Sequence, residues 1–236
     1  MAAKRMSRVL CAADPAGSLE AVETLFAAVD ENDAQAIALV GDLSDGEGSS
    51  DSFRSMLQAL GKSKLPVYWV PGPSDAPVGV YLREVANSEV VNPQLRGVHG
   101  TAAMAPGGHI LFSGLGGMIS DDPGAAREEI DALLYPRWEA EYRLKLLADL
   151  DEHQQVMLFF TPPAHKGIEA SGSDVVAELI ATYRPRLVVT YAEPPIVEKI
   201  GRSVVVAPGT IRHGHYAVAD LQAEEAELKQ LSGTRA

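Results

Sequence analysis

Short apolar runs alternate with helical patterns along the first third of the chain, and this alternation limits the fold more than any other feature. The runs are rich in Val, Ile or Leu, are too short for helices, and cover residues 9–13, 36–40 and 67–70. Between them, residues 18–31 and 50–60 carry apolar side chains at helical spacing. Two strand-helix-strand crossovers predict a parallel sheet whose strands are buried on both faces.

The rest of the chain predicts a hairpin followed by further buried strands. Segments 101–105 and 110–114 flank Pro106-Gly107-Gly108, which is typical of an antiparallel hairpin. Residues 125–149 are predicted to be helical, with a break near Pro136. Further strands are predicted at 156–160, 187–190, 204–207 and 216–221, with a helix at 174–183 and a polar, acidic tail. Without an internal repeat or linker, residues 1–236 are expected to form a single α/β domain.

The charge of the chain excludes several classes of partner. A net charge of −12 without any block of Lys and Arg argues against nucleic acid and against a polybasic membrane contact. No run approaches the roughly 20 apolar residues of a membrane span. The single cysteine, Cys11, excludes an internal disulfide, and the first apolar run is too short for a secretory signal. We therefore expect a cytoplasmic protein.

Polar residues stand directly after the predicted strands. Asp14 follows the first strand, Asp42 the second, and Ser74 and Asp75 the third, while Glu193 follows a later one. Ligands of open α/β sheets bind beyond the carboxyl ends of the strands. These residues are therefore candidates for a functional site.

The succession of loops resembles the calcineurin-like metallophosphoesterase family, whose strand-end motifs are Asp-x-His, Gly-Asp, Gly-Asn-His, a single His and Gly-His-x-His. The resemblance covers nearly the whole chain and is greatest to compact bacterial members that keep the fold while losing parts of the motifs. It implies a four-layer α/β/β/α sandwich. It also implies phosphoester hydrolysis with two divalent metals, Mn, Fe or Zn, one of whose bound hydroxides attacks phosphorus.

Most of the implied metal ligands are replaced in this chain. Asp14 and Asp42 match the first metal-binding aspartate and the bridging aspartate, but no histidine stands at the other positions. The replacements are Ala16, Pro73-Ser74, Phe160 or Thr161, and Ala192, Glu193, Pro194 and Pro195. Because Ala, Pro and Phe offer no donor, we expect no dinuclear centre, and either no metal or a single weakly bound Mg or Ca.

The retained carboxylates allow several states. Asp14 and Asp42 are predicted to share a proton, to be neutralised by a basic neighbour, or to hold one hard cation. Asp75 and Glu193 are candidate substitute ligands. Simpler roles remain open for two of these residues, because Asp42 could shape a turn and Asp75 could cap a helix that begins at Pro77.

Histidines and a lysine supply further candidates. His165 and Lys166 lie in a Pro-rich loop where they could contact a small phosphorylated ligand, or simply face solvent. His213 and His215 have a spacing that metals use on an extended segment, or are surface residues. Asp45 is a further candidate ligand in the loop of Asp42.

Two functional hypotheses follow. In the first, the protein has lost efficient hydrolysis and works as a binding or regulatory module. In the second, it is an active phosphomonoesterase or phosphodiesterase that uses the substitute ligands. Tyr135, Trp138 and Tyr142 are predicted to form one helix face packed on the core or against a second subunit, so a homo-oligomer is also considered.

Overall fold

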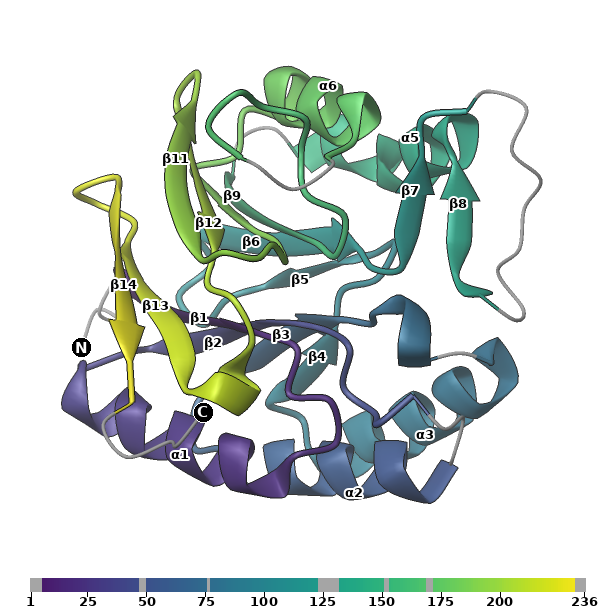
Figure 1. Ribbon diagram of the computed structural model, residues 1–236, viewed down its shortest axis with the longest axis vertical. Coiled ribbons are helices and arrows are strands. Elements are labelled where there is room, and N and C mark those ends of the chain that lie inside the picture. The colour runs from purple at the N-terminus through teal and green to yellow at the C-terminus, as the bar shows by residue number, and fades with distance from the viewer. Residues whose placement is uncertain are drawn as a thin grey trace.

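Two six-stranded sheets pack face to face, and helices cover the outer face of each sheet (Figure 1). The structure is a computed structural model that describes residues 6–46, 50–75, 77–122, 132–150, 153–168 and 172–231. The expected four-layer α/β/β/α sandwich is confirmed.

The first sheet contains the predicted parallel strands and has the order β14-β13-β1-β2-β3-β4. Strands β1 to β4 are parallel, β13 runs antiparallel to β1, and β14 is antiparallel to β13. The strand bounds are β1 (Arg8–Ala13), β2 (Ala36–Val40), β3 (Val67–Val70), β4 (Leu95–Gly97), β13 (His215–Asp220) and β14 (Glu225–Gln230). The helices on its outer face are α1 (Leu19–Glu31), α2 (Ser50–Leu60) and α3 (Val78–Val91).

The second sheet has the order β11-β12-β10-β9-β6-β5. Its strands are β5 (Ala102–Met104), β6 (Ile110–Leu115), β9 (Gln154–Phe159), β10 (Leu187–Val189), β11 (Ile196–Ile200) and β12 (Ser203–Ala207). The helices α5 (Arg137–Leu144) and α6 (Asp174–Tyr183) lie on its outer side (Figure 1). A separate parallel pair is formed by β7 (Met118–Ser120) and β8 (Leu134–Pro136). The β5–β6 pairing confirms the predicted hairpin.

Side-chain alternation on the strands builds separate cores. On β1, Val9 and Cys11 enter the core between the two sheets, whereas Leu10 enters the core under the helices. The rings of Tyr68 and Phe112 stack between the sheets with centroids 3.7 Å apart. Burial of each side chain of this size contributes about 1.5–3 kcal/mol to folding stability. The burial of Tyr68 and Phe112 against each other therefore helps to hold the two sheets together.

Three sequence expectations need correction. Within 125–149, residues 125–131 lie outside the described residues, β8 ends at Pro136, and α5 covers only Arg137–Leu144 before a 3-10 segment. The polar tail contains the edge strand β14, whose backbone pairs with β13 regardless of side-chain polarity. Tyr135 is a buried residue of β8, while Trp138 and Tyr142 are exposed on α5, so the three do not share one helix face packed on the core.

Among the described helices, none has the length and apolar character needed to cross a bilayer. The longest, α3, has 14 residues and therefore spans only ~21 Å.

Candidate functional site

Asp42 lies just after β2, and its carboxylate is fixed by Ser74 from the loop after β3. The Ser74 amide donates to Oδ1 at 2.8 Å, and the Ser74 hydroxyl donates to Oδ2 at 2.7 Å. Burial raises the pKa of Asp42, and the nearby charge of Asp14 raises it further, while the bonds from Ser74 oppose this rise. From the sequence, Ser74 was a strand-end candidate at the position of a missing histidine, and its role as a hydrogen-bond donor to Asp42 was not predicted.

Two glycines allow the loops after β2 and β3 to approach each other. A Cβ on Gly72 would lie 2.0 Å from Oδ1 of Asp42, and a Cβ on Gly41 would lie 2.0 Å from the amide nitrogen of Gly72. Such distances exclude any side chain at these positions. The glycines therefore set the place of the Asp42 carboxylate.

Asp75 ties these two loops together from inside. It is 3% exposed, and its carboxylate accepts hydrogen bonds from the amides of Leu43, Ser44 and Gly72. Burial raises the pKa of Asp75 to about 6 despite these amides, which favour the charged form. The prediction that Asp75 caps a helix is wrong, because the N-cap residue of α3 is Pro77 and no side chain forms a capping hydrogen bond there.

Asp14, directly after β1, lies beside Asp42. Its backbone has a φ of 51° and its amide donates to the carbonyl oxygen of Val40 at 2.9 Å. Burial raises the pKa of Asp14, the Thr210 hydroxyl and the charge of Arg212 lower it, and the charge of Glu193 raises it. Arg212 is thus a candidate for the basic neighbour that was expected, as one of three states, to neutralise the pair of Asp14 and Asp42.

Thr210 joins Asp14 to Glu193. Its hydroxyl donates to the backbone carbonyl of Asp14 at 2.7 Å, and its amide donates to Oε1 of Glu193 at 3.1 Å. The loop of Thr210 leaves β12 in the second sheet and leads to β13 in the first. Sequence reasoning missed this residue, whose only signal was its place after a predicted strand.

An aromatic pair lines the same neighbourhood. Phe160, at a position where the family has its single histidine, stacks on Tyr191 with ring centroids 5.4 Å apart. Burial raises the pKa of Tyr191, and the charges of Asp14, Glu193 and Asp42 raise it further. Thr161 is also engaged, since its hydroxyl oxygen accepts from the amide of Ile119 at 2.9 Å. The charges of three carboxylates therefore act on the Tyr191 hydroxyl.

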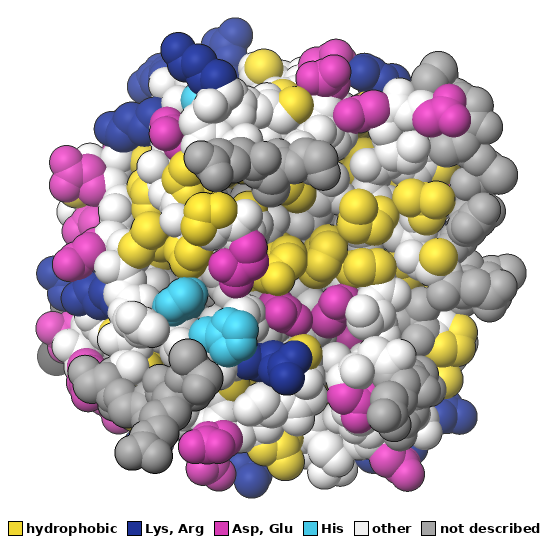
Figure 2. Space-filling view, in the orientation of Figure 1, with side chains coloured by type: hydrophobic (Ala, Val, Ile, Leu, Met, Phe, Trp, Pro, Cys, Tyr) yellow, Lys and Arg dark blue, Asp and Glu magenta, His cyan; other side chains and the backbone are white. Residues whose placement is uncertain are grey.

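His213 and His215 lie near this group, but not on one extended segment as expected. His213 ends a short 3-10 helix, and Gly214, with a φ of 79°, separates it from the first residue of β13. The charge of His213 lowers the pKa of Asp14. A Cβ on Gly209 would lie 3.1 Å from His215 Nδ1 and 3.4 Å from Glu193 Oε1, so these groups are near neighbours. Figure 2 shows histidine, basic and acidic side chains gathered below a band of apolar ones.

The other candidates lie in different settings. The Nδ1 atom of His165 accepts from the amide of Gly167 at 3.2 Å, and Lys166 is exposed. Within the described residues, neither forms a hydrogen bond or ion pair with Asp14, Asp42 or Glu193. Asp45 is exposed near Gly17, where a Cβ would lie 3.1 Å from the Asp45 Cβ.

The donors at this site do not fit two transition metals. Both oxygens of Asp42 accept hydrogen bonds from Ser74, and none of the family's histidine positions carries an imidazole in this chain. In the part of the chain that the structure describes, no three His, Cys, Asp or Glu side chains are arranged to hold a metal. Carboxylate oxygens are instead the ligands that hard cations such as Mg and Ca prefer.

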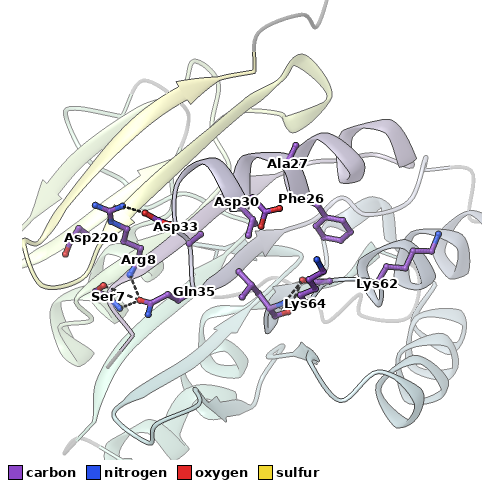
Figure 3. A pocket seen from close by; sticks show the side chains of 14 residues that line it. Ser7, Arg8, Phe26, Ala27, Asp30, Asp33, Gln35, Lys62, Lys64 and Asp220 are labelled. Atoms are coloured by element: carbon purple, nitrogen blue, oxygen red, sulfur yellow. Dashed lines mark hydrogen bonds and ion pairs between the residues drawn. The ribbon is translucent and has the colours of Figure 1, made fainter. Parts of the chain in front are cut away.

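A cavity of about 890 Å³ opens at the opposite edge of the first sheet (Figure 3). Its lining balances three basic residues against three acidic ones: Arg8, Lys62, Lys64, Asp30, Asp33 and Asp220. In Figure 3 Arg8 reaches toward Asp33, with which it pairs at 3.9 Å. The cavity contains none of the candidate site residues.

Comparisons with known proteins agree with this layout. The family described as metallophosphoesterase, calcineurin superfamily, matches residues 52–231. The crystal structure of TT1561 from Thermus thermophilus is 40% identical, with a TM-score of 0.90, over 96% of this chain and 99% of that one. No curated protein gives a significant match.

More distant solved structures share the fold. A dimetal phosphatase from Danio rerio is 10% identical with a TM-score of 0.63, over 92% of this chain and 93% of that one. An archaeal phosphodiesterase is 8% identical with a TM-score of 0.55, over 95% and 99% of the two chains. The family match covers well over half of the sequence, and the chain belongs to the calcineurin superfamily of metallophosphoesterases.

Proposed function

We propose that this protein uses the metallophosphoesterase fold as a binding or regulatory module and hydrolyses phosphoesters weakly or not at all. The observation that carries the proposal is the state of Asp42, the residue at the bridging position. Both of its oxygens accept hydrogen bonds from Ser74, the residue that stands where the family has a metal-binding histidine. A bridging role would require the same two oxygens to bind two cations in addition to these hydrogen bonds.

The remaining chemistry suits protons or one hard cation. Asp14, Asp42 and Glu193 are close enough to raise the pKa of Tyr191 together, and the pKa values of Asp14 and Asp42 are themselves raised. One Mg or Ca would relieve this repulsion through oxygen ligands. A bare phosphate would be repelled, so a phosphorylated ligand is not proposed for this strand-end site.

One observation favours a second candidate, an active phosphomonoesterase or phosphodiesterase with substitute ligands. The charges of Glu193 and His213 both act on Asp14, so two carboxylates and an imidazole lie in one region. These are the donor types that a single catalytic cation uses, although the described side chains are not arranged around one.

Metal content and turnover distinguish the two candidates. Purified protein is dialysed against Mn, Fe, Zn, Mg or Ca in turn, bound metal is measured, and p-nitrophenyl phosphate and its bis ester serve as substrates. We expect at most one Mg or Ca per chain and turnover no faster than the buffer blank. D14N and D42N remove carboxylates of the site, and D33N removes an exposed carboxylate elsewhere as the matched control.

Turnover that disappears in D14N and D42N but persists in D33N would overturn the proposed binding role. With one bound cation, that result would establish the second candidate. With two transition-metal ions, it would restore the family's dinuclear chemistry.

A further inference from the structure

A second cavity, of about 490 Å³, lies at the end of the second sheet opposite the strand-end loops. It is formed at the start of β9, in the segment between α6 and β10, and in the turn between β11 and β12. Because β9 and β10 are parallel, their amino ends lie a strand length away from the carboxyl ends that carry the site described above. Its lining includes His153, Gln155, Arg184, Arg186, Arg202 and Glu224.

This cavity is basic in an otherwise acidic protein. Its described lining holds three arginines and one acidic residue, whereas the whole chain has a net charge of −12. Arg186 is already engaged, since it donates to the carbonyl of Leu221 at 2.7 Å and lies 3.7 Å from Glu224. Among the described residues, the side chains of Arg184 and Arg202 have no hydrogen bond or ion pair. Two guanidinium groups therefore remain for a ligand.

The inner wall carries polar atoms without partners. Gln155 is 6% exposed, and its Oε1 atom is buried without a hydrogen bond among the described residues. The Nδ1 atom of His153 is likewise buried without a hydrogen bond among the described residues. Buried polar groups are normally paired by protein, water or ligand. Both atoms are closed to solvent in this conformation, so a group that enters the cavity reaches them only if the side chains of Gln155 and His153 turn toward it.

We propose that this cavity binds a phosphate group, as the free ion or as a phosphomonoester, between Arg184 and Arg202. Planar guanidinium groups match the geometry of phosphate oxygens and form charge-assisted hydrogen bonds with them. The cavity is within the ~300–1,000 Å³ range of small-molecule sites and leaves room for an organic group.

Calorimetric titration with inorganic phosphate and with glycerol 3-phosphate, at low ionic strength, tests the proposal. The double variant R184Q/R202Q removes two charges from exposed positions, and K62Q/K64Q removes two from the other cavity as the matched control. We expect saturable binding to the unaltered protein, a loss of affinity of at least about tenfold in R184Q/R202Q, and no change in K62Q/K64Q. Circular dichroism verifies that both double variants are folded.

Each outcome bears on the proposal. Tighter binding of glycerol 3-phosphate supports a phosphomonoester, and equal binding of the two probes supports the free ion. The absence of saturable binding, or an equal loss in both double variants, would overturn the proposal. Binding that persists in R184Q/R202Q and is lost in R212Q would also overturn it, because the anion would then occupy the strand-end site.

Discussion

Ser74 donates two hydrogen bonds to Asp42, one from its amide to Oδ1 at 2.8 Å and one from its hydroxyl to Oδ2 at 2.7 Å. The residue at a lost histidine position thus supplies donors to the carboxylate that the family uses to bridge metals. The carboxylate is held by protein hydrogen bonds, and these donors and the charge of Arg212 oppose the rise in the pKa values of Asp42 and Asp14, respectively.

Removing the hydroxyl in Ser74→Ala is expected to raise the pKa of Asp42, because the charged carboxylate loses a donor. The free energy of unfolding should fall by about 1 kcal/mol. Carboxyl NMR titration and urea unfolding measure the two effects. Ser74→Thr keeps a hydroxyl and should resemble the unaltered protein; an unchanged Asp42 titration in Ser74→Ala would contradict the assigned bond.

Replacing Asp75 by Asn should cost about 2–4 kcal/mol at pH 7.5, because the amide group offers fewer lone pairs to the three backbone donors. The exposed Asp33→Asn is the control and should change stability little. Urea unfolding of both variants gives the comparison. Equal stability of the two variants would contradict the bracing role of Asp75.

Asp75 also predicts a pH dependence of stability. Its pKa is raised to about 6 on folding, so the folded state binds more protons than the unfolded state between about pH 4 and pH 6. Stability from this group is complete below about pH 4 and is lost as pH rises through 6. The stability gap between the unaltered protein and Asp75→Asn should therefore widen by about 1 kcal/mol from pH 7.5 to 5.5. A gap that narrows over this range would refute the raised pKa.

Gly72→Ala is expected to unfold the protein or displace Asp42, since the new Cβ would lie 2.0 Å from Oδ1. Thermal melting should show a large loss of stability. Gly79→Ala is the matched control, because it adds the same methyl group on helix α3 with no atom within 4 Å. That variant should gain up to about 1 kcal/mol from helix propensity; similar melting of the two variants would argue against the close contact.

Thr210→Val should lower the free energy of unfolding by about 1–2 kcal/mol, because the bond from its hydroxyl to the Asp14 carbonyl is lost and that carbonyl is left without this partner. Thr210→Ser retains the donor and should lose less. Urea unfolding compares the two. If Thr210→Ser is destabilising and Thr210→Val is not, methyl packing and not the hydroxyl is what matters.

Local sequence patterns predicted most of the elements. The bounds of β2, β3, α2 and α6 agree with the predicted segments, because periodic burial and capping residues are encoded within each segment. The position of Asp14 and Asp42 after buried strands was also predicted from the sequence. The edge strand β14 was not predicted, because a strand of polar residues forms by pairing with free backbone groups of its neighbour, here β13.

By itself the sequence determined the layered α/β fold, the strand-end positions of Asp14 and Asp42, and the loss of the family's histidines. Only the tertiary structure decided what replaces the lost ligands: Ser74 on Asp42, three backbone amides on Asp75, and Thr210 joining Asp14 to Glu193. The physical reason is the sequence separation over which each kind of interaction acts. Periodicity acts over a few residues, whereas Thr210 meets Asp14 across 196 positions, a contact that forms only when the two sheets bring their loops together.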